Sequence, residues 1–244
     1  MPRLILAIII IAFCILFVGR PRADEYPVDA NIITALDVSS SINAQETMLQ
    51  IEGMARAIRS PAVVAAIGAG KLRRIGFMIF AWADGDFPVL AAWQVIATAD
   101  DADRAAADIM TRLQNLIDTS SRSVGTLTNL SAALEHAADL LSDGPYSSRR
   151  SVVNVIGNGE DNVGEDTERA RADLLAMGAT INAVAVGGDP AILNYYRSQV
   201  IGGRLAFVLP VSRVEEMTAV LAAKFSSEIS SLNIERNDDA HEDP

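Results

Sequence analysis

The chain has 244 residues, half of them hydrophobic, and its formal net charge is −11 with a pI near 4.6. This length and apolar content predict one globular domain rather than a disordered or fibrous chain. No run rich in lysine and arginine occurs, so the composition argues against nucleic acid as a partner.

The first segment of the chain is typical of an export signal. Residues 4–18 form an unbroken apolar run, which has the length of a signal-peptide core and is short for a membrane span. We expect residues 1–23 to be a signal peptide cleaved after Ala23, which places the protein in the periplasm or outside the cell. Pro21 in the cleavage region and the nearby arginines keep an alternative open, an uncleaved inner-membrane anchor with the domain facing the periplasm.

The only cysteine, Cys14, lies inside this apolar run. Cleavage therefore leaves a mature chain without a thiol, which excludes disulfides, zinc–thiolate sites and cysteine catalysis. A chain without thiols also suits an oxidising compartment.

The first strand of the domain is predicted in the apolar run 32–36, which is typical of a strand buried on both faces of a parallel sheet. Asp37, Ser39 and Ser41 follow this run directly. In open α/β sheets, ligands bind at the edge where the strands end. One carboxylate and two hydroxyls at alternate positions can converge if the turn curls, and they offer only hard oxygens, which suit Mg²⁺, Mn²⁺ or Ca²⁺.

A helix over residues 43–59 is predicted to follow the turn. Asn43 is a good N-cap, and Glu46 three residues later completes a capping-box pair. The apolar residues of this segment recur at helical spacing, namely Met48, Ile51, Ala55 and Ile58. A short helical extension over 61–67 continues it.

The middle of the chain predicts a hairpin. Residues 74–83 and 87–96 are two apolar runs joined by Asp84-Gly85-Asp86, so the second should be antiparallel and lie at the sheet edge. We interpret the two aspartates as turn residues rather than cation ligands. A helix over 98–117 and a polar loop over 118–125 come next.

The second half of the chain alternates the two element types. Predicted strands span 151–156, 180–186 and 204–209; predicted helices span 130–141, 166–177, 191–200 and 211–229. This alternation with one hairpin predicts a doubly wound α/β fold, with a mostly parallel sheet and one antiparallel edge strand. No internal repeat divides the single domain, residues 24–230, and the acidic segment 231–244 is expected to be a disordered tail.

Three separated segments together resemble von Willebrand factor A domains over about residues 29–230. They are Asp37-x-Ser39-x-Ser41, the segment 125–134 with Thr128 just before a helix, and the strand and turn 152–159 that contain Asn158. The element order and the tryptophan-bearing hairpin are similar to a bacterial subgroup of secreted A-like proteins without an assigned function.

The resemblance implies a metal-ion-dependent adhesion site. In the family, two serines and a threonine contact the metal, two aspartates hold it mainly through water, and a ligand's carboxylate fills the sixth position. Here the matching residues are Ser39, Ser41, Thr128 and Asp37, and Thr126 is the alternative to Thr128.

Asn158 stands where the family has its second aspartate. Its amide oxygen can accept from a metal-bound water, but it brings no charge, so the metal affinity should be lower. Glu160 or Asp161 would be able to supply the missing charge.

The resemblance therefore implies an exported module that captures an acidic group of a protein partner through Mg²⁺, or Mn²⁺ or Ca²⁺. The alternative is a metal-independent interaction domain with a degenerate site. A metal-dependent phosphoryl hydrolase using Asp37 is disfavoured, because Ser39 stands where a phosphatase of the haloacid-dehalogenase type has a second acid. No P-loop or histidine-based catalytic set occurs either. No membrane contact beyond the N-terminal segment is expected.

Overall fold

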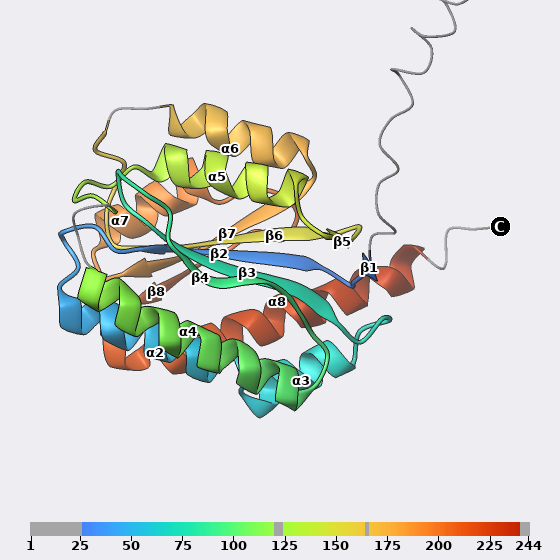
Figure 1. The fold of residues 1–244 in the computed structure, drawn as a ribbon. Helices are drawn as coiled ribbons and strands as arrows, with labels where there is room; N and C mark the ends of the chain where they lie inside the picture. Colours follow the sequence, from blue (N-terminus) through green and yellow to red (C-terminus); the bar gives the residue numbers. More distant parts are fainter. Residues whose placement is uncertain (1–25, 120–123, 164–165, 240–244) are drawn as a thin grey trace, which may run out of the picture.

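The computed structural model describes residues 26–119, 124–163 and 166–239, so the predicted signal segment, Cys14 and the last five residues lie outside the described chain. Figure 1 shows one mostly parallel sheet between two layers of helices. The strand order is β4-β3-β2-β6-β7-β8, and only the β3–β4 pair is antiparallel. This confirms the predicted fold class and the antiparallel edge strand. The strands are β2 (Asn31–Asp37), β3 (Ile75–Trp82), β4 (Val89–Ile96), β6 (Ser151–Gly157), β7 (Ala179–Val186) and β8 (Val208–Val211).

Strand β2 lies in the middle of the sheet, between β3 and β6, and all seven of its residues are buried. Its apolar side chains alternate between two hydrophobic clusters, one on each face, as Ile32 and Ile33 illustrate. The continuous apolar run therefore meets apolar neighbours on both sides, as expected for a parallel strand covered by helices on both faces.

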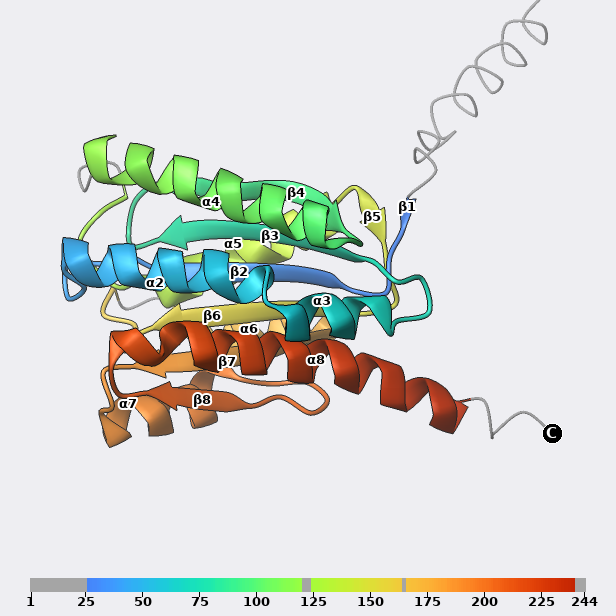
Figure 2. The same cartoon turned by 90° about the horizontal axis from the view of Figure 1, so that it is seen from below.

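The helices divide into two layers. Helices α2 (Ala44–Ile58), α3 (Pro61–Gly68), α4 (Ala99–Thr119) and α8 (Met217–Asp239) cover one face, which Figure 2 shows from below. Helices α5 (Leu130–Ser142), α6 (Thr167–Ala176) and α7 (Pro190–Tyr195) cover the other face, and α7 continues into a π-helical turn, Tyr196–Val200. Within the described ranges, no helix combines the length and the apolar character needed to cross a membrane.

The predicted capping box at the start of α2 is confirmed. The Asn43 side chain accepts from the Glu46 backbone N–H, and the Glu46 carboxylate accepts from the Asn43 N–H, both at 3.0 Å. These two bonds satisfy backbone donors that the first helical turn leaves free. They also fix where the helix begins relative to the serine turn before it.

Three predicted boundaries in the C-terminal part are wrong. Strand β8 begins at Val208 rather than at residue 204, because Leu205 adopts a left-handed backbone with φ of 56° in a turn before it. The last helix begins at Met217, after a 3₁₀ turn at Val214–Glu216, instead of at residue 211. It continues to Asp239, ten residues past the predicted end at residue 229, so residues 231–239 belong to this helix. The sequence 230–239 contains no glycine or proline that would end the helix.

A second sheet of two short strands, β1 (Tyr26–Pro27) and β5 (Tyr146–Ser147), was not predicted. Strands of two residues carry no periodicity that a sequence pattern can detect.

Helix α8 is joined to the middle of the sheet by a buried polar network. The Lys224 ammonium donates to Asn154 Oδ1 and to Glu228 Oε1. Asn182 Nδ2 donates to Glu228 Oε1 at 2.6 Å, and Asn154 Nδ2 donates to Glu228 Oε2 at 3.3 Å. All four residues are almost fully buried, and the polar groups satisfy one another.

Candidate metal site

The candidate site lies where β2 and β6 end side by side. The two strands pair in parallel, with Leu36 opposite Ile156. Asp37 is the last residue of β2, and Asn158 follows the last residue of β6. Because parallel strands end at one edge of the sheet, this register alone brings the first and third predicted segments together.

All five predicted site residues meet at this edge. Ser39 Oγ lies 3.1 Å from Ser41 Oγ, and the Thr128 hydroxyl donates to Ser39 Oγ at 3.4 Å. The Ser41 hydroxyl donates to Asn158 Oδ1 at 2.8 Å. Neighbouring ligands of an octahedral Mg²⁺ with bonds of about 2.1 Å lie roughly 3.0 Å apart. The spacing of the hydroxyls therefore fits a small hard cation.

Asp37 is the one carboxylate of the site and is completely buried. Its Oδ1 accepts from the Ser39 N–H at 2.8 Å, while Oδ2 has no hydrogen-bond partner within the described part of the chain. Burial raises the pKa of Asp37 to about 6, although the nearby polar groups of Ser39 and the backbone of Asn158 act in the opposite direction. A nearby cation would favour the charged carboxylate, so this unpartnered oxygen fits a site that binds a cation.

The hydroxyl of Tyr196, on the π-helical turn Tyr196–Val200, is another buried polar group that makes no hydrogen bond to the residues described in the structure. A Cβ atom on Gly157 would lie 2.5 Å from this hydroxyl and 3.0 Å from Asp37 Oδ2. Both orphan oxygens therefore border the space left by the missing side chain of Gly157. Burial and the nearby Asp37 raise the pKa of Tyr196 well above its usual value, so its hydroxyl stays protonated and can act as a donor.

The loop that carries Thr128 is held by Asp84, which the sequence predicted only as a turn residue, and by Asn162, for which no role was predicted. Asp84 Oδ1 accepts from the Thr126 N–H at 2.5 Å and from the Leu127 N–H at 2.8 Å, and the Leu127 bond is the main cause that lowers the pKa of Asp84. Asn162 Oδ1 accepts from the Thr128 N–H at 2.8 Å, and the Asn162 N–H donates to the Thr128 carbonyl. These bonds fix the backbone of the loop on both sides of the hydroxyl.

Thr128, and not Thr126, supplies the hydroxyl of the site. Thr128 is buried against Ser39, whereas Thr126 is exposed and offers its backbone carbonyl to the Ser40 N–H and hydroxyl. Ser40 Oγ therefore points to this loop rather than to the other serines.

Asp161 is engaged elsewhere. Its carboxylate accepts from the N–H groups of Ser131 and Val163, both at 3.1 Å. It therefore stabilises the start of α5 and the following loop, and moving it to the metal site would break these bonds. Glu160 is exposed.

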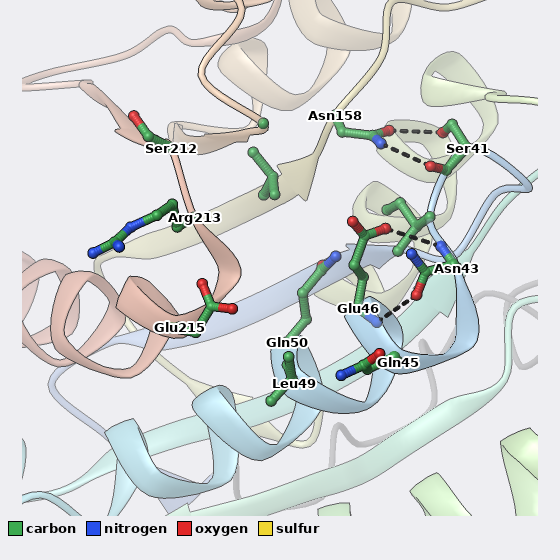
Figure 3. Close-up of a pocket in the computed structure, with 13 residues that line it drawn as sticks. Ser41, Asn43, Gln45, Glu46, Leu49, Gln50, Asn158, Ser212, Arg213 and Glu215 are labelled. Atoms are coloured by element: carbon green, nitrogen blue, oxygen red, sulfur yellow. Dashed lines mark hydrogen bonds between the residues drawn. The ribbon is translucent and has the colours of Figure 1, made fainter.

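A polar cavity of about 460 Å³ adjoins the site and shares Ser41 and Asn158 with it. Figure 3 shows the two hydrogen bonds between these residues and, beside them, the capping box of α2. The far side of the cavity is formed by the end of β7 and by the segment before α8, with Arg213 and Glu215.

The chemistry of the residues present fits a hard divalent cation. Three hydroxyls and one carboxylate offer only oxygen, which suits Mg²⁺, Mn²⁺ or Ca²⁺. Among the described residues, no group of three or more acids, histidines or cysteines is placed to hold a metal. The single negative charge of Asp37 is therefore the main electrostatic attraction of this site for a cation.

The fold is that of von Willebrand factor A domains. A matching structure is proximal thread matrix protein 1 from the mussel byssus, with 19% identity, a TM-score of 0.58, and coverage of 86% of this chain and 49% of that chain. Another structure of the same protein is described as having a zinc-occupied MIDAS motif, the abbreviation for the metal-ion-dependent adhesion site; it has 18% identity, a TM-score of 0.57, and the same coverage. A von Willebrand factor type A protein from Catenulispora acidiphila has 18% identity and a TM-score of 0.55, over 84% of this chain and 43% of that chain.

The chain thus spans about half the length of these solved proteins. Residues 27–233 match the model of a family described as protein of unknown function, DUF1194, and the chain belongs to this family. No curated protein matches the sequence.

Proposed function

We propose that this protein is an exported binding module that captures a carboxylate of a partner protein through a divalent cation, with Mg²⁺ as the first candidate. The observation that carries the proposal is the meeting of Asp37, Ser39, Ser41, Thr128 and Asn158 at one edge of the sheet, with hydroxyl spacings suited to an octahedral ion. Neutral hydroxyls and one carboxylate leave a bound dication with a net positive charge.

That net charge favours an anionic group as the next ligand. Ser41 is exposed and Asn158 is half-buried, so this side of the site faces solvent, whereas Asp37 closes the inner side. A carboxylate on a partner would reach the ion from outside and complete its coordination. Asn158 would accept from a metal-bound water without neutralising the charge.

We propose that the protein acts in the periplasm or outside the cell, after cleavage of residues 1–23 or as an inner-membrane-anchored protein. The apolar run 4–18 supports this location. Fractionation and mass measurement of the N-terminus test it; a full-length cytoplasmic protein would contradict it.

The test of the function is capture of partners from the native cell envelope. Immobilised domain should retain a partner in Mg²⁺ and release it on addition of EDTA. Ser41→Ala should lose the capture, because it removes a ligand at the exposed side. Ser40→Ala is the matched control, since the Ser40 hydroxyl faces Thr126 instead of the site. Release by free acetate, and not by chloride, would show that the partner binds through a carboxylate.

A second candidate is a metal-independent interaction domain of the same fold. The hydrogen bond from Ser41 to Asn158 supports it, because the hydroxyl is satisfied without an ion. In that case, capture resists EDTA and Ser41→Ala behaves like Ser40→Ala.

A further inference from the structure

The cavity beside the candidate metal site is lined by a buried amide that has no hydrogen-bond partner among the described residues. Gln50, on the second turn of α2, is 1% exposed, and neither its Oε1 nor its Nε2 makes a hydrogen bond to any residue that the structure describes. Figure 3 shows this amide directed from α2 into the space between Glu46 and the segment that carries Arg213 and Glu215. A methionine at this position would have a similar shape and would avoid the cost of burying two unpaired polar atoms.

The ligand that would satisfy Gln50 is defined by its hydrogen-bonding groups. The amide presents a donor and an acceptor side by side. A carboxylate offers only acceptors, and an ammonium or guanidinium offers only donors. A trans peptide group has its N–H and C=O on opposite sides. A primary carboxamide carries both groups at one end and can pair with both atoms of Gln50.

The charges around the cavity agree with a neutral ligand. Two carboxylates, Glu46 and Glu215, line it, and the guanidinium of Arg213 is bound to Glu216 through Nε at 3.1 Å and Nη2 at 2.9 Å. The lining is therefore net negative and disfavours an anion. A volume of about 460 Å³ equals that of roughly fifteen waters at about 30 Å³ each, enough for a side chain and several waters.

We propose that this cavity binds an asparagine or glutamine side chain of the partner protein, whose carboxamide pairs with Gln50. The cavity and the candidate metal site share Ser41 and Asn158, so this asparagine or glutamine would lie next to the partner's acidic residue that binds the metal. This adjacency rests on the proposed function. The contact with Gln50 itself needs no metal.

Because both polar atoms of Gln50 are buried, a ligand reaches them only when a neighbouring side chain moves, and we infer that this side chain is Glu46. This side chain lies beside Gln50 in Figure 3, is only half-buried, and accepts a hydrogen bond from the Asn43 N–H. When it turns outward, the other half of the capping box, from the Glu46 N–H to the Asn43 side chain, remains. The start of α2 therefore stays capped while the end of the cavity opens.

The test uses three small probes of matched length: N-acetyl-glutamine methylamide, the corresponding glutamate compound and the corresponding methionine compound. Each is titrated into the ¹⁵N-labelled protein, and the side-chain amide resonances of Gln50 are followed by NMR. The glutamine probe should shift these resonances in a saturable way at millimolar concentration, in Mg²⁺ and in EDTA alike. The other two probes should bind at least tenfold more weakly.

Two variants on the same helix complete the test, with backbone amide shifts around the cavity as the readout. Gln50→Met should weaken binding of the glutamine probe at least tenfold while the protein stays folded, whereas Met48→Gln, at an exposed position of the same helix outside the cavity lining, should bind it as the wild type does. Equal shifts with all three probes, unchanged binding by Gln50→Met, or no shift with the glutamine probe at 100 mM would overturn the proposal. Probe binding in EDTA without any Mg²⁺ binding would leave the cavity assignment intact and contradict the proposed function instead.

Discussion

Two buried polar clusters of this protein differ in whether their groups have partners. In the network of Lys224, Glu228, Asn154 and Asn182, the ammonium and both carboxylate oxygens are hydrogen-bonded within the chain. At the edge of the sheet, Asp37 Oδ2 and the Tyr196 hydroxyl are equally buried and have no hydrogen-bond partner in the part of the chain that the structure describes. The closed network serves the fold, because it joins α8 to the middle of the sheet. The open cluster marks a place where a ligand would complete the interactions.

The largest expected effect follows from breaking the closed network. Lys224→Met removes the ammonium and leaves the Glu228 carboxylate buried without its counter-charge. Loss of one partner of a buried pair costs about 3–5 kcal/mol, and the free energy of unfolding from urea titration should fall by this amount.

The double variant Lys224→Met/Glu228→Leu is the control for this prediction. It removes both charges, so it should lose much less stability than the single variant. A single variant within about 1 kcal/mol of the wild type would show that the pair does not act as a closed unit.

The open cluster should respond to pH. The folded-state pKa of Asp37, about 6, lies above the unfolded value of 3.8, so the folded state holds this proton more tightly. The resulting stability is present below pH 4 and is lost as the pH rises through 6. In EDTA, the wild type should lose about 2 kcal/mol relative to Asp37→Asn between pH 4.5 and 7.5. Parallel pH profiles of the two proteins in urea unfolding would contradict this.

Asn158→Asp should have a smaller effect that changes sign with metal. Without metal, the new carboxylate repels Asp37 and lowers the free energy of unfolding. With Mg²⁺, it adds a second negative charge, and we expect about tenfold tighter binding, or about 1.4 kcal/mol. Calorimetric titration of both proteins checks the prediction. Equal affinities would show that Asn158 does not face the cation.

Tyr196→Phe should have the smallest effect on stability and on Mg²⁺ affinity, because it removes only the unpaired hydroxyl. In EDTA, the variant should be as stable as the wild type or more stable, because a buried donor without a partner is lost. In Mg²⁺, binding should weaken by about threefold, or roughly 0.7 kcal/mol, if this hydroxyl supports Oδ2 of Asp37. Unchanged Mg²⁺ affinity would assign the hydroxyl no role at the site.

The sequence predicted those parts of the site whose residues lie close together along the chain. Asp37 and Ser39 are two residues apart and are joined by their own hydrogen bond, and the apolar run before them identifies a strand end. Asp84 and Asn162 were not predicted to hold the Thr128 loop, because they act across 42 and 34 residues. Nothing in their local sequence indicates which loop they meet.

The face of α2 was predicted only in part. Ile51, Ala55 and Ile58 are buried as expected. Met48 was expected to be buried but is 38% exposed, and Gln50, a polar residue, is buried instead. The apolar spacing of α2 predicts which face of the helix packs against the sheet. It does not predict which residues of the first two turns line the cavity. For this reason the orphan amide could be found only in the structure.

The central claim is that five residues at one edge of the sheet form a hard-cation site, and Mg²⁺ titration tests it most directly. Calorimetry should show one Mg²⁺ per chain, and Mg²⁺ at a hundredfold excess over its Kd should raise the free energy of unfolding by about 2.7 kcal/mol. Ser40→Ala should retain both effects, and Asp37→Ala should remain folded and lose both. Absence of binding heat together with an unchanged unfolding curve of the wild type in millimolar Mg²⁺ would contradict the claim.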